Sequence, residues 1–152
     1  MKIVTDSGTD ASALNSAGYE IYELPLKVTI GEKTYLDGMA GKQDDFYTMM
    51  EHSKILPKTS QPAVGDFVEL YRRLAKEDKE ILSIHISSGL SGTINSARSA
   101  AEMVPEANVT IVDTKTLSVG SGWQVITAAK AAAAGWTKDQ IVPLLHRIAQ
   151  AS

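Results

Sequence analysis

Residues 81–93 read Ile-Leu-Ser-Ile-His-Ile-Ser-Ser-Gly-Leu-Ser-Gly-Thr, an apolar run that passes directly into a polar loop. A short apolar run bounded by turn residues predicts a strand buried in a parallel sheet. The helix expected after the loop places its apolar side chains on one face: Ile94, Ala97, Ala101 and Val104. This strand–loop–helix unit indicates an α/β fold.

The same unit recurs along the chain. Lys2–Thr5 and Val109–Val112 are two further short apolar runs. We therefore expect five side chains to be buried in one parallel sheet: Ile3, Ile81, Ile84, Val109 and Val112. Three more segments have helical apolar spacing, namely Phe67, Leu70, Tyr71 and Leu74; Val119, Trp123, Ile126 and Ala133; and Ile141, Leu144, Leu145 and Ile148. Residues 1–152 are thus predicted to form a single α/β domain, a mostly parallel sheet flanked by helices.

Three segments depart from this regular alternation. Residues 24–30 alternate apolar and polar side chains, which predicts one strand with a solvated face, and Pro25 places it at a sheet edge. A helix is expected from Asp44 or Asp45, and residues 55–62 read as a loop between two prolines. Pro143 is expected to kink the last helix or limit its first segment.

Composition excludes several classes of protein. The chain has 152 residues, no Cys, and 15 basic against 18 acidic residues, a net charge of −3. Disulfides and thiolate metal sites are therefore excluded, and a dedicated nucleic-acid binder is not expected. The sequence contains neither a run of about 18 apolar residues nor a signal peptide, which predicts a cytoplasmic protein without stable membrane insertion.

Ligands of open α/β sheets bind beyond the carboxyl ends of the strands. Polar segments follow three of the predicted strands, at Asp6-Ser7, Ser87–Thr93 and Asp113-Thr114. Together they form a polar rim at the carboxyl ends of the strands, and the Thr59-Ser60 segment can reach the same rim. This rim is rich in hydroxyls and poor in cations. A helix opening near Ser91-Gly92-Thr93 would hold a small oxyanion at its N-terminus.

Simpler structural roles remain open for each of these residues. Ser91 can be only an N-cap, and Thr59 or Ser60 can cap the helix after Pro62. Asp6 and Asp113 are short acids that more often cap a turn than bind a metal. Neither a metal nor a cofactor is expected.

A serine hydrolase is an alternative function. The string Gly89-Leu90-Ser91-Gly92-Thr93 approaches the G-x-S-x-G nucleophile elbow but lacks its final glycine. His85 and Asp113 are nominal triad partners, and the hypothesis requires His85 within hydrogen-bond reach of Ser91. His85 lies inside an apolar strand, where a core histidine is the commoner explanation.

Six strings resemble, in order along nearly the whole chain, those of the DegV family of bacterial fatty-acid-binding proteins. Two of them, residues 58–62 and 87–93, are specific as a pair. The six strings are Val4-Thr5-Asp6-Ser7, Pro25-Leu26-Lys27-Val28, Tyr35-Leu36-Asp37-Gly38, Lys58-Thr59-Ser60-Gln61-Pro62, Ser87-Ser88-Gly89-Leu90-Ser91-Gly92-Thr93 and Val112-Asp113-Thr114-Lys115.

The resemblance implies a carrier that binds one long-chain fatty acid and is not itself an enzyme. By motif, Thr59 and Ser91 would bind the carboxylate, with Ser60, Gly92 and Thr93 adjacent to it. The family presents the carboxylate to a separate fatty acid kinase, which makes an acyl phosphate for phospholipid synthesis.

Members of this family have a second α/β domain that supplies an Arg, a His and half of the acyl tunnel. The resemblance assigns residues 1–152 to the N-terminal half, with the second domain absent. A truncated domain without activity is therefore a further alternative. Without that domain, the stripe of Leu144, Leu145 and Ile148 is expected to be partly exposed, which predicts a homodimer.

Overall fold

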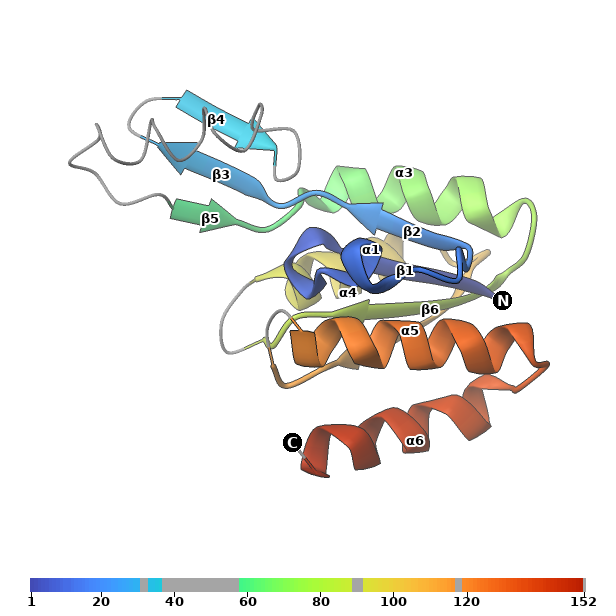
Figure 1. Ribbon diagram of the computed structural model, residues 1–152. Coiled ribbons are helices and arrows are strands. Elements are labelled where there is room, and N and C mark those ends of the chain that lie inside the picture. The colour runs from blue at the N-terminus through green and yellow to red at the C-terminus, as the bar shows by residue number, and fades with distance from the viewer. Residues whose placement is uncertain (31–32, 37–57, 89–91, 117–118, 152) are drawn as a thin grey trace.

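The computed structural model describes residues 1–30, 33–36, 58–88, 92–116 and 119–151 (Figure 1). Its main sheet contains four strands that all run parallel. Their order across the sheet is β2 (Ile21–Leu24), β1 (Lys2–Asp6), β6 (Glu80–His85) and β7 (Asn108–Asp113). The predicted parallel sheet is confirmed, and the sequence analysis missed only its edge strand β2.

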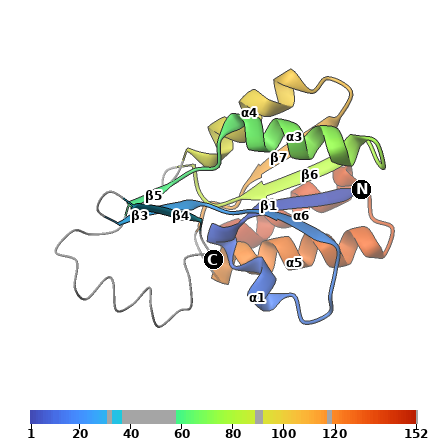
Figure 2. The same ribbon diagram turned by 90° about the horizontal axis from the view of Figure 1, so that it is seen from above.

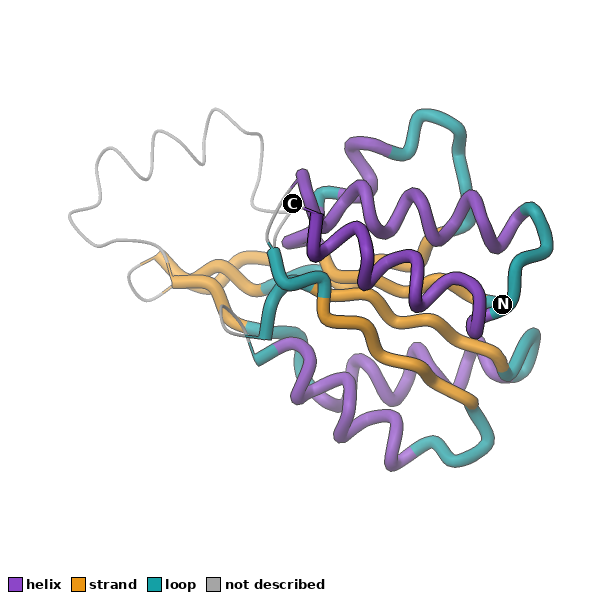
Figure 3. Tube along the Cα trace, turned by 90° about the horizontal axis from the view of Figure 1, so that it is seen from below, coloured by secondary structure: helices purple, strands orange, loops and turns teal. Residues whose placement is uncertain are grey.

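Helices cover both faces of this sheet, as Figures 2 and 3 show. One face carries α3 (Val64–Ala75) and α4 (Thr93–Met103). The other carries α1 (Ala11–Leu14), α5 (Val119–Ala133) and α6 (Lys138–Ala151). The chain is therefore a three-layer α/β domain, as predicted.

The alternation of side chains along β6 divides the interior into two cores. Leu82 and Ile84 face α5 and α6, whereas Ile81 packs with α3 and α4. Ser83 and His85 lie on the same face as Ile81, so an apolar strand carries two polar side chains into one core. Of the five side chains expected to be buried, Val109 is only half-buried, because β7 lies at the sheet edge.

A second, antiparallel sheet lies beyond the carboxyl ends of the parallel strands (Figure 1). Its order is β4 (Lys33–Leu36), β3 (Lys27–Ile30) and β5 (Lys58–Ser60). The prediction of one edge strand over residues 24–30 is wrong, because the chain leaves the parallel sheet after Leu24. The loop expected over 55–62 contains β5, and the helix expected from Asp44 or Asp45 lies outside the described residues.

The apolar face predicted for α5 is also wrong. Trp123 is 52% exposed and Ala133 is exposed, whereas Val125, Ala128 and Ala129 are buried. The small residues face inward because α5 packs very closely on the turn before α1. At Gly122 there is no room for a side chain between α5 and the Thr9 carbonyl of this turn.

Helix α6 runs without interruption from Lys138 to Ala151 and includes Pro143. The expected limit on its first segment is therefore wrong. Pro143 removes only the bond to the Asp139 carbonyl, and Asp139 is exposed to water. Leu145 is fully buried, whereas Leu144 and Ile148 are half-buried, so the stripe is partly exposed, as expected.

The close approach at Gly122 gives a first prediction. A methyl group at Gly122 would lie 2.5 Å from the Thr9 carbonyl oxygen and 2.7 Å from Cδ1 of Leu14. We expect Gly122→Ala to lower the free energy of unfolding by about 1–3 kcal/mol. Gly65→Ala is the matched control, because that glycine is also helical and a methyl group there meets nothing within 4 Å. It should raise stability by about 0.4–1 kcal/mol, measured by urea unfolding. If Gly122→Ala and Gly65→Ala changed the free energy of unfolding by the same amount, the close approach of α5 at Gly122 would not limit the size of the residue there.

Candidate functional site

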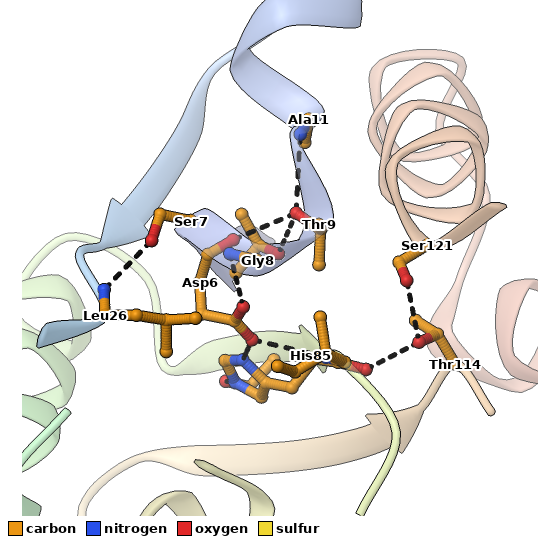
Figure 4. A network of polar contacts seen from close by, with 12 residues as sticks. Asp6, Ser7, Gly8, Thr9, Ala11, Leu26, His85, Thr114 and Ser121 are labelled. Atoms are coloured by element: carbon orange, nitrogen blue, oxygen red, sulfur yellow. Dashed lines mark hydrogen bonds and ion pairs between the residues drawn. The ribbon is translucent and has the colours of Figure 1, made fainter. Parts of the chain in front are cut away.

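Asp6 is the centre of a buried polar network at the carboxyl ends of β1 and β6 (Figure 4). Its Oδ1 accepts from the backbone N–H of Gly8 at 2.8 Å. Its Oδ2 accepts from Nδ1 of His85 at 2.9 Å and from the backbone N–H of Ile86 at 3.3 Å. The carboxyl group is fully buried, so these three donors replace the water it has lost. Asp6 therefore joins the ends of two neighbouring strands.

The network continues from His85 into the core beneath α3. Nε2 of His85 lies 2.6 Å from Oγ of Ser83, which lies 2.7 Å from the hydroxyl of Tyr71. Burial raises the pKa of the Tyr71 phenol, so the phenol remains a donor. Donation from Tyr71 to Ser83, from Ser83 to Nε2 and from Nδ1 to Asp6 satisfies every member of the chain. This network was not predicted, although the Ser and His two residues apart in an apolar strand were its signal.

This geometry bears directly on the hydrolase alternative. Both ring nitrogens of His85 have partners, so His85 is not available as a base for Ser91. Asp6, His85 and Ser83 are the residue types of a catalytic triad, but Ser83 is fully buried in the central strand. A substrate carbonyl cannot reach a nucleophile enclosed in this way. The core interpretation of His85 is confirmed.

Other polar residues at the rim hold the backbone in place. Oγ of Ser7 accepts from the N–H of Leu26 at 2.9 Å, where the chain leaves the parallel sheet. The Thr114 hydroxyl donates to the His85 carbonyl at 2.8 Å. Although burial raises the pKa of Asp113, hydrogen bonds from Ser88 and the backbone N–H of Lys115 bring it below its usual value. Asp6 and Asp113 are thus turn-capping acids.

The predicted ligand residues lie in two segments. Thr59 and Ser60 belong to β5, where the backbones of Val28 and Lys27 are their partners in β3. Gly92 is the N-cap of α4, and Thr93 is fully buried in its first turn. Ser91 lies outside the described residues.

Neither capping alternative matches the helix starts. The N-cap of α3 is Ala63, three residues beyond Ser60. The N-cap of α4 is Gly92, one residue beyond Ser91. The N-cap residues considered from sequence are therefore not the N-caps of these two helices.

One side chain joins the two segments. A methyl group placed on Gly92 would lie 3.1 Å from both Cδ and Nε2 of Gln61 and 3.3 Å from its Oε1. Gln61 directly follows β5, so the end of β5 lies beside the N-terminus of α4. Unpaired backbone N–H groups at a helix N-terminus attract anions. The arrangement is chemically suited to a small oxyanion such as a carboxylate.

Among the described residues, no group of three or more His, Asp or Glu side chains is arranged to hold a metal ion. No helix in these ranges is long and apolar enough to cross a bilayer. A surface pocket of about 770 Å³ lies at the opposite end of the sheet, where its lining includes Met1, Asn108, Trp136 and Pro143. That pocket is remote from the polar rim.

Comparison with known proteins identifies the family. The family model described as "Uncharacterised protein, DegV family" matches residues 1–152. The chain belongs to the DegV family. A DegV domain-containing protein of Staphylococcus aureus is 40% identical over 146 residues, which cover 96% of this DegV chain and 52% of that protein. The resemblance drawn from the six strings is confirmed.

Solved DegV structures share the fold. DegV from Bacillus subtilis, described as a fatty acid binding protein, has a TM-score of 0.88 and 30% identity, covering 98% of this chain and 53% of that chain. A DegV family protein from Thermus thermophilus, described by its fatty acid binding, has a TM-score of 0.86 and 32% identity, with coverage of 98% and 53%. This DegV chain therefore spans about half the length of these relatives.

Proposed function

We propose that this chain binds a long-chain fatty acid, with the carboxylate at the N-terminus of α4. Thr59, Ser60 and Ser91 supply hydroxyls, and Gly92 and Thr93 supply the start of the helix. The observation that carries the proposal is the contact between Gln61 and Gly92, which brings the end of β5 to that helix terminus. The fatty acid binding of the Bacillus subtilis and Thermus thermophilus relatives supports it.

The proposed role is that of a carrier rather than an enzyme. A separate ATP-dependent fatty acid kinase acts on the presented carboxylate, and the resulting acyl phosphate enters phospholipid synthesis. The chain contributes binding and orientation, and no group of its own reacts. A cytoplasmic location in a bacterium and a homodimer are part of the same proposal, and the half-buried Leu144 supports self-association.

Lipid identification and titration test this function. Native mass spectrometry of the purified chain, followed by organic extraction, should yield one fatty acid per chain. Oleate is then titrated into the parent, Thr59→Ala and Ser91→Ala. A hydrogen bond to a charged group is worth about 1.5–3 kcal/mol, so each change should weaken binding by about 10- to 150-fold.

Stability separates ligand contacts from structural ones. Since the N-cap of α4 is Gly92, Ser91→Ala should leave the melting temperature nearly unchanged. Thr127→Ala is the matched control, because its hydroxyl donates to the Trp123 carbonyl of its own helix at 2.8 Å. It should bind oleate like the parent. Unaltered binding by both site variants would refute the carboxylate assignment, and a parent that binds no fatty acid would refute the function.

A further inference from the structure

The backbone conformation of Gly92 does not require a glycine, but the space beside it is limited. Its φ of −80° and ψ of 7° suit any residue. Space is what restricts the position, because a methyl group there would crowd three atoms of the Gln61 amide at 3.1–3.3 Å. Real methyl groups rarely approach other atoms so closely, so an alanine would shift the amide of the exposed Gln61 side chain by a few tenths of an ångström. The Gln61 amide therefore occupies the space that a side chain on Gly92 would fill, and we call this space the seat of Gln61.

The two residues that meet are far apart in sequence. Gln61 follows β5 in the small antiparallel sheet, whereas Gly92 begins α4 on the parallel sheet. Helix α3 and strand β6 lie between them along the chain. The contact between Gln61 and Gly92 thus links the two sheets, at the place where the proposed carboxylate ligands must converge. Each of the two segments carries part of that ligand set.

We infer that Gln61 is a positioning residue: seated on Gly92, it holds the Thr59–Ser60 segment against the N-terminus of α4. This role rests on the proposed fatty acid binding. Gln61 acts through its neighbours Thr59 and Ser60, and its own amide need not touch the ligand. If the Gln61 amide is displaced, the β5 segment is held less firmly beside the amides of α4, and binding of a carboxylate there should weaken.

A double-mutant cycle tests this coupling. Oleate is titrated into the parent chain, Gly92→Ala, Gln61→Ala and the double variant. Removing the Gln61 amide relieves the crowding at Gly92, so Gly92→Ala should weaken binding less in the Gln61→Ala background than in the parent. Directly contacting residues couple by about 0.5–3 kcal/mol, so the two losses should differ by about 2- to 150-fold.

Two controls separate positioning from a general effect on structure. Gly65→Ala, at a glycine with open space around it, should leave the oleate affinity of each background unchanged. Gln61→Met keeps the length of the side chain without its amide, and it should retain most of the binding lost in Gln61→Ala. Melting temperatures, recorded in parallel, should not follow the binding losses.

The outcomes distinguish this inference from the proposed function. If the parent binds oleate and Gly92→Ala costs the same affinity in both backgrounds, the positioning role is wrong and fatty acid binding stands. If the affinity losses merely follow the losses in melting temperature, Gln61 has a structural role only and the inference is overturned. A parent chain that binds no fatty acid overturns both.

Discussion

Asp6→Ala is expected to lower the free energy of unfolding by about 3–5 kcal/mol. The change leaves three donors without their acceptor, namely the N–H groups of Gly8 and Ile86 and Nδ1 of His85. Each buried donor left unsatisfied costs about 1–3 kcal/mol, and partial entry of water reduces the sum. Chemical unfolding followed by circular dichroism measures the effect.

Two further variants identify the cause of the stability loss expected in Asp6→Ala. Asp6→Asn keeps the volume of the side chain but places an amide donor opposite donors, so it should destabilise nearly as much as alanine. Asp113→Ala is the matched control, because that carboxyl group also caps a turn at a strand end but is partly exposed. It should cost about 1 kcal/mol. Equal losses for Asp6→Ala and Asp113→Ala would show that the buried network contributes nothing beyond an ordinary cap.

Phe67→Ala is expected to lower the free energy of unfolding by about 3–5 kcal/mol. The Phe67 ring is fully buried and meets the His85 ring edge-on, with centroids 5.2 Å apart, and the Tyr71 ring at 5.6 Å. Truncation leaves a cavity and also removes the apolar cover of the His85–Ser83–Tyr71 chain. Urea unfolding at neutral pH measures both contributions together.

Trp123→Ala provides the control for this second prediction. Trp123 is the larger residue and falls on an apparent apolar stripe, but it is 52% exposed. Its truncation should change stability by no more than about 0.5 kcal/mol. Phe67→Leu should cost less than Phe67→Ala because part of the volume is retained. A loss in Trp123→Ala as large as that in Phe67→Ala would contradict the burial of these two aromatic residues.

Local patterns were sufficient for most of the parallel sheet and for α3. The apolar runs ending at Asp6, Ile86 and Asp113 mark strands because apolar segments of that length must be buried on both faces. The pattern failed to predict the strands at Leu24–Ile30. Apolar and polar side chains alternate without a break there, although Leu24 ends a strand of one sheet and Lys27–Ile30 belongs to another. Alternation reports which side chains are solvated, and it carries no information about which strand is the neighbour.

For the candidate site, the sequence identified the two segments but not what joins them. The strings around Thr59 and Ser91 were recognised by motif, and the anion-binding character of a helix terminus followed from elementary electrostatics. Gln61 was not singled out, because its importance lies in its contact with Gly92. A contact between β5 and α4 depends on how two sheets are placed, which no local pattern records.

The sequence by itself determined the α/β class, the parallel strands β1, β6 and β7, and the polar character of the rim, since these depend on burial and hydrogen bonding within short segments. Only the tertiary structure decided which face of α5 is buried, how Asp6 and His85 pair, and where Gln61 rests. These features arise from close approach between distant segments. At such places small residues matter more than large apolar ones: the absent side chain of Gly122 lets α5 approach the backbone at Thr9, and that of Gly92 leaves room for the Gln61 amide.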